Sequence, residues 1–253
     1  TRRIDTGSGR DEWYYLSVTL NNLLNRLQEG FEMQRRFIAN ASHELSTPLT
    51  SISSQLEVFL DKERDAGQYR QVMESIYQDV RHLSKLTQTL LRFAQASGDH
   101  GGIEIEPVRV DEILMRLPAE MKKMNVVYSV FLSFENLPEE ETRLVVLGNS
   151  ELLFAAIKNI VSNACKYSAD HRAVVSLESK LGSVIVIIKD NGRGIPENEL
   201  KNIFQPFYRA VNSDSYGFGL GLSLSKRIIK LHNGQISVHS RLNEGTTFEI
   251  ALP

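Results

Sequence analysis

The sequence predicts an α + α/β protein with two domains, a helical hairpin followed by an α/β sandwich, and three observations support this fold class. Apolar residues in the first third recur at helical spacing in long runs. Residues 97–102, Ser-Gly-Asp-His-Gly-Gly, have the composition of a linker. Beyond them, segments with helical periodicity are mixed with segments that alternate as strands do.

The first third is expected to form long paired helices. Leu16, Leu20, Leu23 and Leu27 are spaced by 4, 3 and 4, which is typical of a coiled-coil seam. Two further apolar stripes, over residues 37–59 and 72–93, predict two helices, and the charged segment Asp61–Gln68 predicts the turn between them. A hairpin with one stripe on each helix cannot bury both alone, so we expect it to dimerise into a four-helix bundle.

The remaining segments predict the elements of the second domain. They are a helix over residues 150–166, a hairpin of strands 172–179 and 183–190, a helix over 219–232, and two half-buried strands on either side of residues 243–245.

Composition narrows the class of protein. The net charge of -2, without a basic stripe, gives no reason to expect a nucleic-acid partner. One cysteine, Cys165, excludes an internal disulfide and fits a reducing cytosol. The longest apolar run, Val184–Ile188, is too short to span a bilayer, and no signal peptide is evident. Because the chain begins at Thr1 without a methionine, we expect a fragment of a longer protein.

The first chemical signal is His43, followed by Glu44. A neutral imidazole has one ring nitrogen able to attack phosphorus, and a neighbouring carboxylate can hold or receive the proton on the other. Thr47 follows one helical turn later on the same face, and Pro48 should bend the helix. An exposed His-Glu pair beside a plain kink would explain the same residues.

The second signal is the helix that carries Asn159 and Asn163, with Lys166 or Tyr167 on the same face. Carboxamide oxygens are suitable ligands for a Mg²⁺ that also holds phosphates, and Lys166 can supply a countercharge. A polar helix face without function is the alternative, although two Asn residues one turn apart make it less attractive.

Asp190 directly follows an apolar strand and begins the run Asp-Asn-Gly-Arg-Gly. A carboxylate there can accept a hydrogen bond from the exocyclic amine of adenine, whereas guanine offers a carbonyl and would be repelled. Gly192 and Gly194 would let the backbone approach a base closely. A tight turn alone explains the same run.

A glycine-rich segment, Gly217–Leu222, precedes a helix, so its backbone N–H groups are expected to face an anion. Before it lies an aromatic segment, in which Phe204 and Phe207 are expected to be core residues. The polar stretch Ala210–Tyr216 is expected to form a mobile lid.

Taken in order, these segments resemble the histidine kinases. The run His-Glu-Leu-x-Thr-Pro-Leu from His43 closely resembles the phosphoacceptor box of that family, although Ser46 stands where Arg or Lys is usual. The segments from Asn159 to Gly245-Thr246-Thr247-Phe248 resemble its nucleotide-binding boxes, so the resemblance covers about residues 31 to 253. It implies the GHKL-type ATP-binding α/β sandwich shared with gyrase, heat-shock chaperone and mismatch-repair ATPases.

The resemblance also implies site residues, with ATP and Mg²⁺ as cofactors. His43, Glu44 and Thr47 would be catalytic, and Asn159 and Asn163 would hold the metal. The implied nucleotide-binding residues are Asn159, Asn163, Lys166, Tyr167, Asp190, Gly192, Gly194, Ile195, Arg209, Gly217, Gly219, Leu220, Gly221, Leu222 and Thr246.

One position separates a kinase from a hydrolase. The related ATPases activate water with a glutamate four residues before the metal-binding asparagine, where this chain has Asn159. An amide cannot take a proton from water, so the expected acceptor is His43. We therefore expect autophosphorylation of His43. The resemblance further implies transfer to an aspartate of a response regulator, and phosphatase activity that involves Thr47.

The expected domains are residues 1–30, 31–97 and 103–253. The first resembles the last helix of a HAMP module, and a plain coiled-coil extension explains it equally well. If it is HAMP, a membrane helix and an outer sensor lie upstream, and this chain is the cytoplasmic part of a membrane protein. Two alternatives from other classes are a nucleotide-gated scaffold without kinase activity and a purely structural dimerisation module.

Overall fold

The structure, a computed structural model, describes residues 12–96, 104–135, 137, 138, 140–180, 182–209 and 217–253. The chain divides into two compact units, Thr1–Leu86 and Thr87–Pro253. The predicted linker over residues 97–102 and the predicted lid over 210–216 lie outside the described residues.

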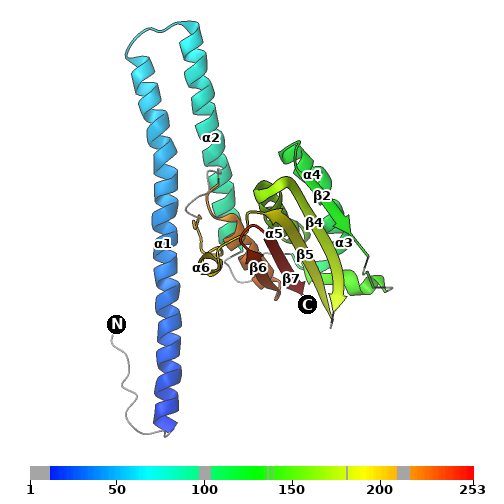
Figure 1. The fold of residues 1–253 in the computed structure, drawn as a ribbon. Coiled ribbons are helices and arrows are strands. Elements are labelled where there is room, and N and C mark those ends of the chain that lie inside the picture. The colour runs from blue at the N-terminus through cyan, green and yellow to red at the C-terminus, as the bar shows by residue number, and fades with distance from the viewer. Residues whose placement is uncertain (1–11, 97–103, 136, 139, 181, 210–216) are drawn as a thin grey trace. The chain divides into compact units, whose positions relative to one another are not determined.

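The predicted helical hairpin is confirmed. Helix α1 spans Glu12–Leu60 and helix α2 spans Ala66–Gln95 (Figure 1). Pro48 lies inside α1 without interrupting it, since the helix continues to Leu60. The helix also runs unbroken past residue 30, so the predicted domain boundary there has no counterpart in secondary structure and stays a prediction.

The predicted turn Asp61–Gln68 was too long at its C-terminal end. The side chain of Asp65 accepts a 3.0 Å hydrogen bond from the backbone N–H of Gln68, and its carbonyl accepts one from Tyr69. An aspartate in this position satisfies N–H groups that a helix start leaves open, so α2 begins at Ala66 despite Gly67 in its first turn.

The apolar stripes of the hairpin are only partly buried. The four leucines of the N-terminal seam, from Leu16 to Leu27, are 40% to 59% exposed. On the helices that follow, Leu49 is 52% exposed and Val80 is 45% exposed. Exposed apolar side chains in a repeating seam suit a helical partner, which is the basis of the predicted dimer.

The second unit contains a five-stranded sheet of order β2-β4-β5-β7-β6 (Figure 1). Strand β2 pairs parallel with β4, and the other neighbours are antiparallel. The predicted 172–190 hairpin and the two C-terminal strands are confirmed. The strands are β2 (Ser129–Ser133), β4 (Ser168–Lys180), β5 (Ser183–Gly192), β6 (Gln235–Arg241) and β7 (Gly245–Leu252).

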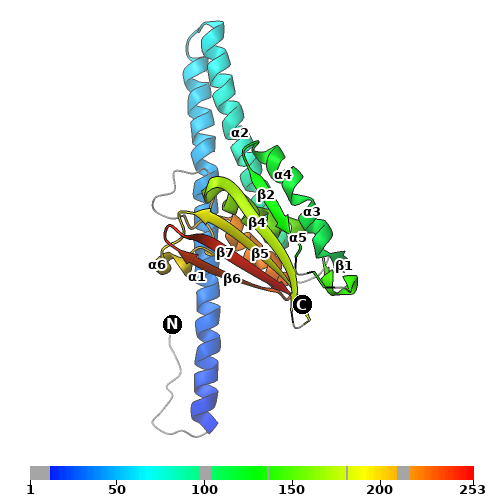
Figure 2. The same ribbon diagram turned by 45° about the vertical axis from the view of Figure 1, so that its right-hand side comes forward.

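A layer of helices covers one face of this sheet (Figure 2). Helix α5 (Ser150–Tyr167) packs on β4 and β5, α7 (Gly221–Leu231) packs on α5 and β6, and α4 (Leu117–Met124) packs on β2. Short helices α3 (Val110–Met115) and α6 (Glu197–Leu200) complete the described set. The core between the layers is apolar, and its fully buried members include Ile157, Ile160, Val186, Ile188 and Ile228. The predicted α/β sandwich is confirmed.

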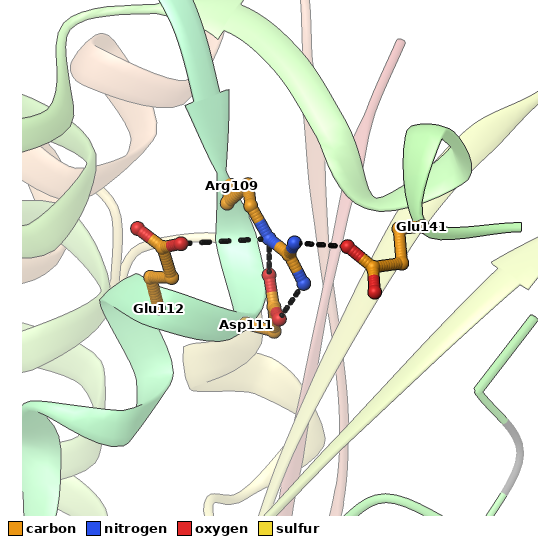
Figure 3. Close-up of polar contacts among 4 residues, drawn as sticks. All are labelled: Arg109, Asp111, Glu112 and Glu141. Atoms are coloured by element: carbon orange, nitrogen blue, oxygen red, sulfur yellow. Dashed lines mark hydrogen bonds and ion pairs between the residues drawn. The ribbon is translucent and has the colours of Figure 1, made fainter.

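The segment before α5 holds elements that the periodicity did not predict. Strands β1 (Glu106–Arg109) and β3 (Val145–Gly148) form a small antiparallel sheet, and a 3₁₀-helix, η1, spans Glu141–Leu144. Arg109 joins them, because its guanidinium contacts Asp111 at 2.7 Å and 3.2 Å, Glu112 at 3.6 Å, and Glu141 (Figure 3). The hydrogen bond from Arg109 lowers the pKa of the Asp111 carboxyl below its ordinary value.

Among the residues described, no helix combines the length and the apolar character needed to cross a membrane.

Candidate functional site

Asp190, near the end of β5, is the central polar group of the second unit. Its side chain is only 5% exposed, and Oδ1 accepts hydrogen bonds from the backbone N–H of Gly192 at 2.8 Å and of Thr246 at 3.2 Å. Burial raises the pKa of this carboxyl, and the two N–H donors oppose that effect. Both hydrogen bonds end on Oδ1, so Oδ2 remains to accept from a donor on a ligand.

Glycines surround Asp190 because the backbone approaches itself closely there. A Cβ on Gly192 would lie 2.3 Å from the carbonyl oxygen of Tyr167. A Cβ on Gly194 would lie 2.0 Å from the carbonyl oxygen of Arg241, and the φ of Gly194 is +70°. No side chain fits at either position, because the backbone of the chain itself fills the space. The predicted close approach to a base stays a prediction.

Helix α5 ends beside this turn and presents the predicted polar face. Asn159, Asn163 and Lys166 are half-buried, and Tyr167 is 37% exposed. Two cations lie over the Tyr167 ring, with Lys166 Nζ at 5.2 Å and the Arg193 guanidinium at 5.3 Å from its centroid.

The glycine-rich segment faces the same side of α5. A Cβ on Gly221 would lie 3.8 Å from the carboxamide carbon of Asn159, and one on Gly217 would lie 3.8 Å from Lys166 Nζ. The predicted nucleotide residues of α5, β5 and the glycine-rich segment are thus brought together in one unit. Asp190 and Tyr167 meet at one end of this arrangement, and Asn159 and Gly221 meet at the other.

The helix after the glycines starts later than predicted, at Gly221 instead of Gly219. Gly219 has φ +68°, which is not a helical conformation, so the helix cannot include it. Its carbonyl accepts a hydrogen bond from Phe207 N at 3.0 Å. The Leu220 side chain is 1% exposed, and Leu222 packs against the core. A ligand at this segment would therefore meet backbone more than these two side chains.

The aromatic segment before the glycines packs as predicted for Phe204, whose ring lies edge-to-face on Phe248 at 6.4 Å. Phe207 is half-buried, with φ +64°. Arg209, the last described residue before the predicted lid, is exposed.

Two further residues connect elements that carry the site, through contacts that the motifs did not reveal. Ser240 of β6 accepts from Ile195 N at 2.8 Å and lies 2.9 Å from the Thr246 hydroxyl, so it connects the glycine turn to β7. His232, the residue that ends α7, is 5% exposed and bonded at both ring nitrogens. The sequence indicates neither contact, because Ser240 stands in an ordinary alternating strand and His232 is a lone histidine.

The phosphoacceptor segment lies in the first unit, on α1. His43 is exposed and therefore accessible to a reactant, and Glu44 is half-buried. The Thr47 hydroxyl is exposed and donates a 3.0 Å hydrogen bond to the carbonyl oxygen of His43. Among the predicted catalytic groups, His43 and Thr47 thus share one face of the helix.

The chemistry of the α5 face fits a divalent cation held partly by phosphates. The described residues include no group of three or more His, Cys, Asp or Glu side chains that could hold a metal. The candidate ligands are instead the carboxamide oxygens of Asn159 and Asn163, which can complete the coordination of Mg²⁺ only together with oxygens of a bound substrate.

Comparison with known proteins agrees with both units. Residues 33–98 match the His Kinase A (phospho-acceptor) domain. Residues 148–253 match the family described as histidine kinase-, DNA gyrase B-, and HSP90-like ATPase. The second unit is therefore an ATP-binding domain of this class.

Among known proteins, histidine kinases resemble this chain in sequence and in fold. The sensor histidine kinase YkoH of Bacillus subtilis (strain 168) is 31% identical over 246 residues, covering 95% of this chain and 52% of YkoH. The fold resembles the Acinetobacter baumannii histidine kinase AdeS, with TM-score 0.63 and 20% identity, over 83% of this chain and 96% of that one. It also resembles histidine kinase ThkA in complex with response regulator protein TrrA, with TM-score 0.68 and 22% identity, over 89% of this chain and 63% of that one.

This chain belongs to the sensor histidine kinases of two-component systems. It spans about half the length of the curated relatives it matches.

Proposed function

We propose that this chain phosphorylates its own His43 with ATP and then donates the phosphoryl group to an aspartate of a response regulator. One observation carries the proposal: an exposed histidine on α1 and a nucleotide site built around Asp190 occur in the same chain. A nucleotide-gated scaffold would need the site but not the histidine, and a structural dimerisation module would need neither.

The site residues divide the work between the two ends of ATP. Asp190 Oδ2 accepts from the adenine amine, and Gly192 and Gly194 admit the base. The backbone N–H groups around Gly219 and Gly221, together with Lys166, bind the phosphates. The remaining implied contacts, Ile195, Arg209, Leu220, Leu222 and Thr246, flank these groups.

Asn159 and Asn163 would hold Mg²⁺, which when bound neutralises charge on the phosphates. Because Asn159 has no basic oxygen, the second unit lacks a group that would activate water in the place of the hydrolase glutamate. Both amides therefore orient the phosphates without starting hydrolysis.

In the transfer step, one ring nitrogen of His43 attacks the terminal phosphorus. A P–N bond forms, the bond to the bridging oxygen breaks, and ADP leaves with that electron pair. Glu44 receives the proton from the other ring nitrogen. For the phosphatase activity, Thr47 would orient a water that hydrolyses the phosphorylated regulator, since its hydroxyl oxygen retains lone pairs while its hydrogen is donated to the His43 carbonyl.

The partners follow from the same arguments. The exposed seams of α1 and α2 support a homodimer. The solved structure of histidine kinase ThkA in complex with response regulator protein TrrA supports a regulator as the second partner. Relatives named as sensors support a sensor role. We also propose that this chain is the cytoplasmic part of a membrane sensor, with residues 1–30 as the end of a HAMP-like module.

The test is incubation of the purified chain with γ-labelled ATP and Mg²⁺. An acid-labile phosphoprotein is expected, and it should be lost in His43→Gln but retained in His82→Gln, a control on the same hairpin. Asn163→Ala should abolish labelling while the dimer persists by light scattering. Equal labelling of His43→Gln would overturn the proposal, and ATP binding without labelling would favour the scaffold. Labelling in a mixed dimer of His43→Gln and Asn163→Ala would establish transfer between chains.

A further inference from the structure

We propose that His232 is a positioning residue for the phosphates of ATP. It hydrogen-bonds the C-terminal end of α7 to Asn149 at the N-terminal end of α5, and both ends are remote from the nucleotide. We call this contact the clasp. The inference rests on the proposed ATP site and concerns residues that contact no part of it. Helices α5 and α7 pack antiparallel, and contacts at three levels hold them together.

The first level is the nucleotide end, where Gly221, the first residue of α7, faces the Asn159 carboxamide. The second is Ser225, which is completely buried and donates to the carbonyl oxygen of Ala156 at 2.8 Å. The third is His232, whose Nε2 accepts from the backbone N–H of Asn149 at 2.9 Å. From Asn149 to Asn159 the helix rises about 15 Å, and from Gly221 to His232 about 16 Å. The three contacts are therefore distributed along the whole length over which these segments of α5 and α7 face each other.

The hydrogen bonds of His232 specify one form of its ring. Nδ1 lies 2.7 Å from the carbonyl oxygen of Ile228, which can only accept, so Nδ1 carries the hydrogen. Nε2 faces the N–H of Asn149, which can only donate, so Nε2 presents its lone pair. The neutral imidazole therefore ties the C-terminal end of α7 to the residue that starts α5.

Asn149 passes this constraint into α5. Its side chain caps the helix by accepting from Leu152 N at 3.0 Å, and its carbonyl accepts from Leu153 N at 3.0 Å. The cap also donates to the carbonyl oxygen of Glu104 at 3.2 Å. Asn149 thus fixes the first turn of the helix that carries Asn159 and Asn163.

Gly148 makes room for the clasp. A Cβ at this position would lie 2.4 Å from Cδ2 and 2.9 Å from Nε2 of His232, and 3.0 Å from Cδ1 of Leu153. Any larger residue would therefore displace the imidazole without changing a group near the nucleotide.

The predicted effect is confined to the phosphate end. The phosphates are expected between the α5 face and the glycine-rich start of α7, whereas Asp190 lies on β5. Loosening the α5–α7 contact should weaken binding of Mg²⁺-ATP at least tenfold, while adenosine, which lacks phosphates, should bind within twofold of the unchanged chain.

The experiment titrates Mg²⁺-ATP and adenosine into the whole chain and three variants. His232→Leu removes both ring contacts, and Gly148→Ala displaces the ring; both should lose ATP affinity at least tenfold and keep adenosine affinity. His232→Gln, whose side-chain oxygen can accept from Asn149 N–H, should bind ATP within threefold of the unchanged chain. Since Gly148→Ala retains the histidine, it remains informative if His232→Leu does not fold.

Val175→Ala, at a completely buried position on β4 that takes no part in the clasp, is the control for lost stability. It should leave the ratio of ATP to adenosine affinity unchanged below its melting temperature. Unchanged ATP affinity in Gly148→Ala, or equal loss of both ligands, would overturn the role of His232. Absence of ATP binding by the unchanged chain would instead contradict the proposed function itself.

Discussion

Thr246 donates its backbone N–H to Oδ1 of Asp190 over 3.2 Å, although the two residues lie 56 positions apart. They are also direct partners in the β5–β7 ladder. The sheet therefore fixes the orientation of the carboxylate before any ligand arrives, and Oδ2 is held in place by backbone instead of by a mobile side chain.

Replacing Asp190 by asparagine should separate stability from binding. Burial raises the pKa of Asp190, so the ionised carboxylate lowers the free energy of unfolding at neutral pH. This loss of stability is absent below the unfolded pKa and grows as pH rises through the folded pKa. The carboxamide of the Asp190→Asn variant can keep the two backbone hydrogen bonds, but its NH₂ group would oppose the adenine amine. At pH 7 the melting temperature should be equal or higher, while ATP affinity falls about 10- to 100-fold, as expected for loss of a charged hydrogen bond.

The matched control for that variant is Glu249→Gln, which removes one carboxylate from an exposed position of β7. Calorimetric titration with ATP and a thermal melt on both variants give the comparison. An Asp190→Asn chain that binds ATP normally would contradict the assignment of this residue to the adenine.

Gly245→Ala should destabilise the second unit severely. Its φ is +97°, and a Cβ would lie 2.1 Å from the carbonyl oxygen of Asp190. Left-handed strain and backbone overlap together should cost about 2–5 kcal/mol of unfolding free energy. Gly182→Ala is the control, because its φ is +79° but no atom lies within 4 Å of the added Cβ. It should cost only about 1–2 kcal/mol. Urea unfolding measures both, and similar losses would argue against the close approach at Asp190.

The Arg109–Asp111 pair should make stability depend on acid pH. Because Arg109 lowers the pKa of Asp111 below its unfolded value of 3.8, the ionised carboxylate stabilises the fold above about pH 4. This stabilisation should disappear as pH falls through the lowered pKa. Urea midpoints at about pH 6 and pH 3 should therefore differ more for the unchanged chain than for Asp111→Asn. An identical pH dependence in both would show that the pair shown in Figure 3 does not couple to folding.

Cys165 should be unreactive in the folded chain. It is completely buried in α5, and burial raises the pKa of its thiol to about 11, so almost no thiolate forms at pH 8. A chromogenic disulfide reagent should react with one thiol only at denaturant concentrations that unfold the second unit. Rapid stoichiometric reaction in buffer would contradict this expectation.

Most long elements could be predicted from the sequence because their periodicity repeats several times. Helices α1, α2 and α5 and the β4–β5 hairpin are examples. The segment from Glu106 to Gly148 could not be predicted, because its strands and helices have only four to eight residues each. Such short runs hold only about one to three periods, too few to establish a pattern, and tertiary contacts decide their conformation.

The site could be predicted in part for a similar reason. Asp190, Asn159 and the glycines stand in ordered motifs, so their roles could be inferred before their proximity was known. Ser240 and His232 act through single contacts to backbone N–H groups that are distant in sequence. Such a contact leaves no spacing in the sequence, and only the packing of β6 and α7 reveals it.

Helix α1 is one uninterrupted run from Glu12 to Leu60, and Pro48 comes only after His43. Between Glu12 and His43 the backbone rises about 46 Å, and each residue turns it by about 100°. The direction in which the imidazole points is therefore in fixed rotational phase with whatever holds the upstream end. Seven residues inserted before His43 would alter that phase by only about 20°, whereas two would turn the histidine to nearly the opposite side.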